Sequence, residues 1–164
     1  MEPKGITSRQ YFKRLTTVYY VLVVGLSVFV ILTGIFLKLE GQLYEFESIK
    51  AFFIMTPLIT VIGFFCSKIV FKRSLEKLSY KEDLIKKMRG YRWALRAKYA
   101  FLAVPSFLTI VVTIITGEKT FLSLAVLLIL LLFIEKPSSI KAAKELDLYS
   151  ENAQTVRNPD KIIA

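Results

Sequence analysis

The chain has 164 residues, of which 54% are hydrophobic and 22% are charged, and its formal net charge is +10 at neutral pH. This composition excludes an ordinary soluble domain and is typical of a helical membrane protein. The sequence contains one cysteine, Cys66, and no histidine, so one chain cannot form a disulfide, a Cys/His metal site or a Cys–His or Ser–His catalytic pair.

The first apolar run covers residues 15–37 and contains no charged side chain. About 20 apolar residues in a helix cross the ~30 Å hydrocarbon core of a bilayer, so this run predicts the first transmembrane helix. Four basic residues precede it, as in a signal peptide, but the apolar core of a signal peptide has only ~7–15 residues. We therefore expect this helix to remain in the protein as a signal anchor.

The second apolar run predicts a transmembrane helix over about residues 50–71. Four small or hydroxylated residues in it are spaced to fall on one face of a helix: Thr56, Thr60, Gly63 and Ser67. Such a face is typical of close helix packing in membranes, and its alternative interpretation is a polar path for a solute. No Asp or Glu lies within an apolar run, which argues against ion-coupled transport, because that process usually uses an intramembrane carboxylate.

Residues 72–98 form a strongly basic connection, with ten Lys or Arg against three Asp or Glu. Five apolar residues recur there at helical spacings and predict one apolar stripe: Leu75, Leu78, Ile85, Met88 and Leu95. We expect the second helix to project past the membrane to about Leu78 and to turn there. The run SYKE at residues 79–82 is typical of a capping box and predicts that a new helix begins near Tyr80. The basic residues are the candidate lipid- or partner-binding residues: Lys72, Arg73, Lys77, Lys81, Lys86, Lys87, Arg89, Arg92, Arg96 and Lys98.

Residues 99–116 and about 119–136 predict the third and fourth transmembrane helices. Because the link between them is short, the two helices must be antiparallel neighbours, with Gly117 placed to end the third helix. Beyond a Pro-Ser-Ser turn, residues 140–149 predict a short amphipathic helix. The tail from Ser150, with Asn158-Pro159-Asp160, predicts a turn followed by a frayed end. Tyr80, Tyr91, Trp93 and Tyr99 are expected at the inner membrane boundary, where aromatic side chains gather.

The distribution of Lys and Arg predicts which side of the membrane each segment occupies. There are four before the first helix, ten in residues 72–98 and five after residue 134, against two and one in the other two links. Because cytoplasmic segments accumulate Lys and Arg, both termini and the basic connection are expected inside. The predicted fold is all-α: a single membrane domain, residues 1–164, with four transmembrane helices in an antiparallel bundle, N-in and C-in.

Several short motifs from Leu84 onward carry a resemblance to a known group of proteins. They are MRGYRW at residues 88–93, TG at 116–117, KPSS at 136–139 and ELDL at 145–148. In this order the C-terminal half resembles small four-helix integral membrane proteins of Bacteroidetes that have no assigned activity. The resemblance implies a multi-pass protein of the bacterial inner membrane and supplies no catalytic residues. The third helix departs from the group by having Ala103-Val104-Pro105 where an acidic residue often opens that helix.

We interpret the protein as non-enzymatic, without cofactor or metal. It is expected to act as a small membrane scaffold or accessory subunit that engages anionic lipid or an acidic protein partner through its basic cytoplasmic face. Nucleic acid is not expected as a partner, because basic charge beside a membrane is already accounted for by lipid. The alternative is a small carrier or channel whose pathway forms in a homo-oligomer, along the face from Thr56 to Ser67.

Overall fold

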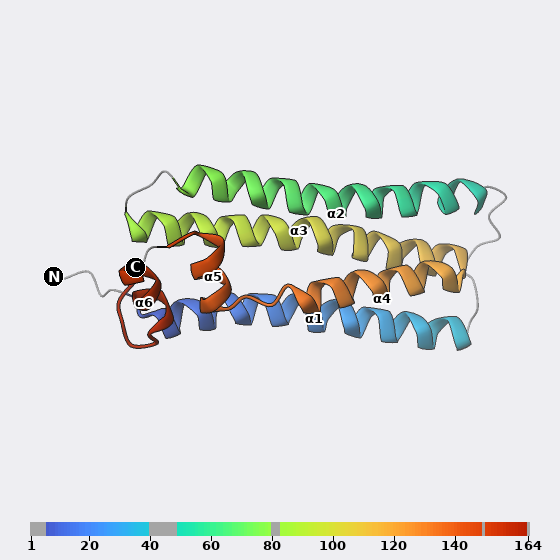
Figure 1. Cartoon of the computed structure of the whole chain (residues 1–164). Coiled ribbons are helices and arrows are strands. Elements are labelled where there is room, and N and C mark those ends of the chain that lie inside the picture. Colours follow the sequence, from blue (N-terminus) through green and yellow to red (C-terminus); the bar gives the residue numbers. More distant parts are fainter. Residues whose placement is uncertain (1–5, 40–48, 80–82, 149, 164) are drawn as a thin grey trace. The chain divides into compact units, whose positions relative to one another are not determined.

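The computed structural model describes residues 6–39, 49–79, 83–148 and 150–163. Within these residues the protein is all-helical, and Figure 1 shows the helices in chain order: α1 (Ser8–Leu39), α2 (Ile49–Ser79), α3 (Leu84–Thr116), α4 (Lys119–Ile134), α5 (Ser139–Glu145) and α6 (Ser150–Arg157). Three helices, α1, α2 and α3, are long and apolar enough to cross a membrane. Counting α4 together with α5, which follows after a bend of 84°, gives a fourth candidate. The prediction of an all-α chain with long apolar helices, compatible with a multi-pass membrane protein, is confirmed.

Local side-chain chemistry accounts for several helix ends. Thr7 precedes α1, and its hydroxyl oxygen accepts a hydrogen bond from the N–H of Gln10 at 3.4 Å, which satisfies one of the free donors of the first turn. Helix α3 ends at Thr116 because Gly117 adopts a φ of 70°, a left-handed conformation that glycine reaches without steric cost. Ser138 caps α5 by accepting from the N–H of Lys141 at 3.2 Å. The prediction that Gly117 ends the third helix is confirmed.

The basic connection belongs to two long helices, and the prediction that the second helix continues past the membrane to about Leu78 is confirmed. Helix α2 continues from the second apolar run to Ser79, and α3 begins at Leu84 and runs through Gly90 without a break. The predicted start near Tyr80 is wrong, because Asp83 is the cap: its carboxylate accepts from the N–H of Ile85 at 3.0 Å. Residues 80–82 lie outside the described part of the chain. The single apolar stripe is also wrong, because its members belong to two different helices.

Packing contacts divide the chain into two compact units. We call Met1–Tyr20, Lys68–Lys98 and Lys136–Ala164 the basic unit, and Val21–Ser67 with Tyr99–Glu135 the apolar unit. In the apolar unit, aromatic pairs join helices that are distant in sequence: the ring centroids of Phe29 and Phe107 are 6.0 Å apart, and those of Phe53 and Phe121 are 5.0 Å apart. The first pair is edge-on and the second is tilted, and such ring contacts stabilise the unit beyond the area that the rings bury.

The predicted turn at residues 158–160 is confirmed, but the prediction of a frayed end is wrong, because the chain is paired up to Ile163. Helix α6 covers Ser150–Arg157, and after it the chain pairs with the residues that precede α1. The N–H of Ser8 donates to the carbonyl of Lys161 at 2.9 Å, and the N–H of Ile163 donates to the carbonyl of Ile6 at 3.0 Å. Ile163 is only 2% exposed. The burial of its side chain stabilises the fold of this end of the chain. The composition did not indicate this contribution, because the C-terminal segment is short and largely polar.

Candidate functional site

The basic unit carries almost all of the positive charge of the chain. It holds 20 of the 23 Lys and Arg residues and eight of the 13 Asp and Glu residues, which gives a net charge of +12. The apolar unit has three lysines against five carboxylates, a net charge of −2. The three segments of the basic unit are separated in sequence, and the fold brings their charges into one compact body.

Most of the candidate binding residues lie on the surface of the basic unit. Six of them are exposed: Lys72, Arg73, Lys77, Lys86, Arg89 and Arg96. Lys87 and Arg92 are half-buried, and Lys81 lies outside the described residues. Lys98 is buried, with its Nζ atom 4.4 Å from the centre of the Phe71 ring, a distance that allows a cation–π interaction. Lys98 therefore adds to the interior of the unit and not to its exposed basic surface.

Two buried tyrosines hold the basic unit together through hydrogen bonds between elements. The Tyr11 hydroxyl of α1 donates to the carbonyl of Met88 in α3 at 2.5 Å, and the Tyr91 hydroxyl donates to the Glu145 carboxylate of α5 at 2.6 Å. A hydrogen bond to a charged group contributes about 1.5–3 kcal/mol. Tyr91 and Tyr99, which were predicted at the inner membrane boundary, are at most 3% exposed and therefore pack inside the protein, and Tyr80 lies outside the described residues. Among the described members of that set, only Trp93 is exposed, at 65%.

Sequence reasoning missed the roles of Tyr11 and Glu145. The segments that contain them were interpreted from their charge and hydropathy. These properties do not show which tyrosine hydroxyl donates to a buried acceptor. Arg92 was counted only as surface charge. Its Nε atom is buried and has no hydrogen-bond partner among the described residues, which leaves a charged donor available to an anion or a water molecule.

The predicted small-residue face of α2 lies against α3 in the apolar unit. Thr56, Thr60 and Ser67 are at most 6% exposed, and Gly63 is buried between them. A Cβ atom added to Gly63 would lie 2.5 Å from Cγ of Pro105 and 2.9 Å from the carbonyl oxygen of Phe101. Both distances are too short for a real Cβ contact. The two helices can therefore approach this closely only because residue 63 is glycine.

Pro105 explains why the Phe101 carbonyl lies at this contact. Proline has no N–H, so the carbonyl four residues earlier loses its usual helical donor. Gly63 covers this oxygen so closely that no side chain could be placed between the two. Sequence reasoning identified the glycine but not the carbonyl that it covers.

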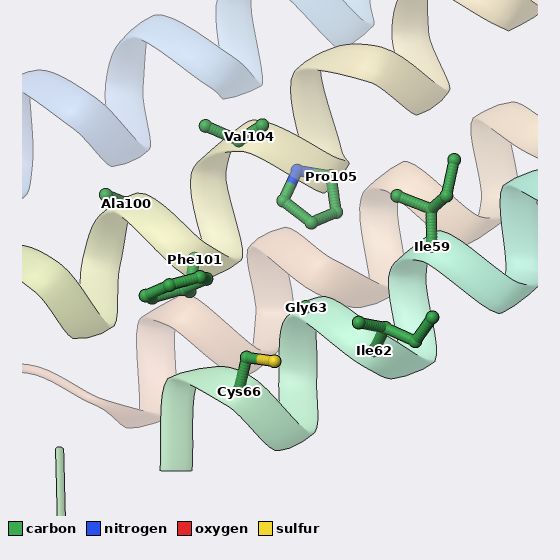
Figure 2. Close-up of a pocket in the computed structure, with 8 residues that line it drawn as sticks. All are labelled: Ile59, Ile62, Gly63, Cys66, Ala100, Phe101, Val104 and Pro105. Atoms are coloured by element: carbon green, nitrogen blue, oxygen red, sulfur yellow. The ribbon is translucent and has the colours of Figure 1, made fainter. Parts of the chain in front are cut away.

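Beside this contact, α2 and α3 leave an apolar pocket of about 300 Å3. Figure 2 shows its lining, with Ile59, Ile62, Gly63 and Cys66 on one helix and Ala100, Phe101, Val104 and Pro105 on the other. The Cys66 thiol is the only reactive side chain in this lining. The lining thus offers no carboxylate, amine or hydroxyl group that could bind or move a polar solute.

The buried hydroxyl groups of the apolar unit bond to their own helices. Thr60 donates to the carbonyl of Thr56 at 2.9 Å, Thr109 to that of Pro105 at 2.7 Å and Thr113 to that of Thr109 at 2.8 Å. Each acceptor lies four residues earlier, a bond that satisfies the hydroxyl without a partner on another helix. The hydrogens of these three hydroxyl groups are therefore already used within their own helices.

Metal chemistry finds no support in the part of the chain that the structure describes, where no three Cys, His, Asp or Glu side chains are grouped. Comparisons with known proteins give no assignment either: no protein-family model, curated protein or solved structure matches the chain. The exposed basic surface of the basic unit is therefore the candidate functional site, and its function must be argued from its own chemistry.

Proposed function

We propose that this chain is a non-enzymatic scaffold or accessory subunit of a bacterial inner membrane, which engages anionic lipid or an acidic protein partner through the basic unit. In this proposal four helices cross the membrane as an antiparallel bundle. Both termini lie in the cytoplasm, and the basic unit lies at the cytoplasmic surface. The proposal needs neither a cofactor nor a metal.

The observation that carries the proposal is the net charge of +12 on the basic unit, with six candidate residues exposed. The cytoplasmic leaflet is negatively charged, and each Lys or Arg near it contributes about 1 kcal/mol of attraction. Topology alone needs fewer basic residues than this unit carries. The tyrosine hydrogen bonds between its elements keep the charges on one ordered surface, which suits a binding role.

The alternative, a carrier or channel formed by an oligomer, loses support from the apolar unit. Of the candidate pathway residues, Thr60 donates its hydroxyl hydrogen to its own helix, and the neighbouring pocket is apolar. A polar solute would have to leave water without receiving new hydrogen bonds, which is costly. We therefore retain the scaffold as the single proposed function.

The proposal is tested by the lipids that the purified protein retains. Replacing Lys72, Arg73 and Lys86 by glutamine removes three exposed charges from the basic unit. At about 1 kcal/mol per charge, its affinity for phosphatidylglycerol should fall on the order of 100-fold. The measurement is native mass spectrometry of the detergent-solubilised protein, titrated with phosphatidylglycerol or with phosphatidylcholine.

The matched control removes the same number of charges from the apolar unit, whose only basic residues are the exposed Lys38, Lys50 and Lys119. Replacing these three by glutamine should leave phosphatidylglycerol binding unchanged. The proposal for lipid fails if both triple variants lose affinity equally. If neither variant changes lipid binding, an acidic protein partner is the only form of the proposal that remains.

A further inference from the structure

The basic unit contains a groove between α2 and α3 whose ligand is not yet assigned. It has a volume of about 390 Å3. Seven residues line it: Ser74, Lys77 and Leu78 from α2, with Gly90, Trp93, Ala94 and Ala97 from α3. All seven belong to the basic unit.

Small side chains on α3 make the groove possible. Gly90, Ala94 and Ala97 follow one another at spacings of four and three residues, so they lie on one face of the helix. Gly90 is in direct contact with the Leu78 side chain, which brings the helices together at one end. Towards Ser74 and Ala97 the small side chains leave space between the same two helices, and the exposed Trp93 indole forms part of the lining.

The groove combines an apolar lining with a single cation. Lys77 is exposed, and the lining contains no carboxylate to neutralise it. The Arg96 guanidinium carbon lies 5.7 Å from the centre of the Trp93 ring, which places a second cation beside the indole. The Ser74 hydroxyl already donates to the carbonyl of Val70 at 2.7 Å, so its hydrogen is not free for a ligand.

The order of these residues along α2 and α3 matches the shape of a phospholipid. On both helices the Ser74 and Ala97 end of the groove is nearer in sequence to the apolar runs, at residues 50–71 and 99–116, than the Leu78 and Gly90 end. In a lipid that lies along the groove, the phosphate would meet Lys77 and the glycerol and first methylenes would meet Trp93 and Ala97. Tryptophan commonly occupies this amphipathic level of a membrane.

We propose that this groove binds one anionic phospholipid, with its phosphate paired to Lys77 and its backbone packed along Trp93, Ala94 and Ala97. The inference rests on the proposed function, because it names one specific lipid site within the basic surface. It goes further by distinguishing Lys77 from the other exposed basic residues, which would attract lipid only through their charge.

Trp93 provides a direct readout because it is the only tryptophan in the chain. The protein is reconstituted in bilayers of phosphatidylcholine that contain a small fraction of phosphatidylglycerol with brominated acyl chains, which quench indole fluorescence on contact. The control bilayers contain the same fraction of brominated phosphatidylcholine. We expect the anionic quencher to be enriched at Trp93, and Lys77→Gln to lower that enrichment about fivefold, as the loss of one cation at the lipid surface implies.

Two further variants separate a specific site from general charge. Lys144→Gln removes the same charge from an exposed position of the basic unit that is outside the groove and is not among the candidate binding residues, and it should keep the enrichment. Ala97→Leu fills the groove without changing any charge and should lower the enrichment as Lys77→Gln does. The inference is overturned if the two brominated lipids quench equally, or if Lys77→Gln and Lys144→Gln behave alike. The triple variant Lys72→Gln, Arg73→Gln, Lys86→Gln leaves Lys77 unchanged. The proposed function is therefore tested separately, and it can hold even if the lipid site in the groove is disproved.

Discussion

The basic unit and the apolar unit use their buried hydroxyl groups in different ways. In the basic unit, Tyr11 and Tyr91 bond to acceptors on other elements, 77 and 54 residues away in sequence. In the apolar unit, Thr60, Thr109 and Thr113 bond to carbonyls of their own helix, four residues earlier. These bonds therefore join distant elements of the basic unit, whereas the threonine bonds of the apolar unit join no two helices, and its helices pack closely at Gly63. Tyr99 of the apolar unit also bonds to another element, because its hydroxyl donates to the carbonyl of Glu135 at 2.9 Å.

This difference follows from the solvent that each unit is expected to meet. Where water is present, exposed loops and helix ends can exchange partners, so specific bonds between elements are needed to fix an arrangement of charges. In hydrocarbon, lipid tails are as apolar as leucine, so helix association depends on how closely the backbones can approach. The comparison predicts that each unit is most sensitive to a different kind of substitution.

The largest effect is expected from Gly63→Ala in the apolar unit. The new Cβ atom would lie 2.5 Å from Pro105 and 2.9 Å from the Phe101 carbonyl, so α2 and α3 would have to separate. Overpacking a tight contact costs about 1–3 kcal/mol, and we expect the upper end of this range because one of the two neighbours is backbone. The measurement is the midpoint of thermal unfolding in detergent.

Gly25→Ala is the matched control. Gly25 also lies within a helix of the apolar unit, but an added Cβ atom would meet nothing within 4 Å. Replacing glycine by alanine inside a helix gains about 1 kcal/mol, so this variant should be as stable as the wild type or more stable. Equal melting midpoints for the two variants would show that the contact at Gly63 does not hold the helices together.

A smaller effect is expected from removing single hydroxyl groups, and it should differ between the units. Tyr91→Phe removes the bond to Glu145 and leaves that carboxylate without its tyrosine donor, so we expect a loss of about 2 kcal/mol. Thr113→Val removes a bond within one helix, and we expect less than about 1 kcal/mol. Both residues are fully buried, which makes the two substitutions comparable.

Unfolding midpoints and hydrogen exchange measure this difference. Tyr91→Phe should also speed amide exchange in α5, where Glu145 is the last residue, whereas Thr113→Val should leave exchange in α5 unchanged. A larger loss of stability from Thr113→Val than from Tyr91→Phe would contradict the comparison between the units.

The sequence allowed the apolar helices and the basic character of residues 72–98 to be predicted, because both depend on composition and spacing. It also identified Gly63, since small residues at helical spacing indicate a packing face. It also predicted that the second helix continues to about Leu78, but it placed the start of the next helix near Tyr80 and not at Leu84. Two capping signals for the next helix lie within five positions, the capping box at residues 79–82 and Asp83. Residue propensities alone do not show at which of the two the helix begins.

Contacts between distant segments were beyond sequence reasoning. The hydrogen bonds of Tyr11 and Tyr91 join residues whose local sequence gives no sign of a partner. The same holds for the C-terminal residues, where the burial of Ile163 and the pairing with Ile6 depend on two ends of the chain meeting. The groove around Lys77 and Trp93 was missed for this reason too, because its two walls come from different helices.

The placement of the basic unit in the cytoplasm is tested most directly by cysteine labelling of intact bacterial spheroplasts. In a Cys66→Ala background, Gln154→Cys reports on α6 of the basic unit and Thr120→Cys on the start of α4; both positions are exposed, and neither substitution changes the charge. We predict that a membrane-impermeant maleimide labels Thr120→Cys in intact spheroplasts and Gln154→Cys only after lysis. Labelling of Gln154→Cys before lysis would place the basic unit outside the cell and contradict its proposed role at the cytoplasmic leaflet.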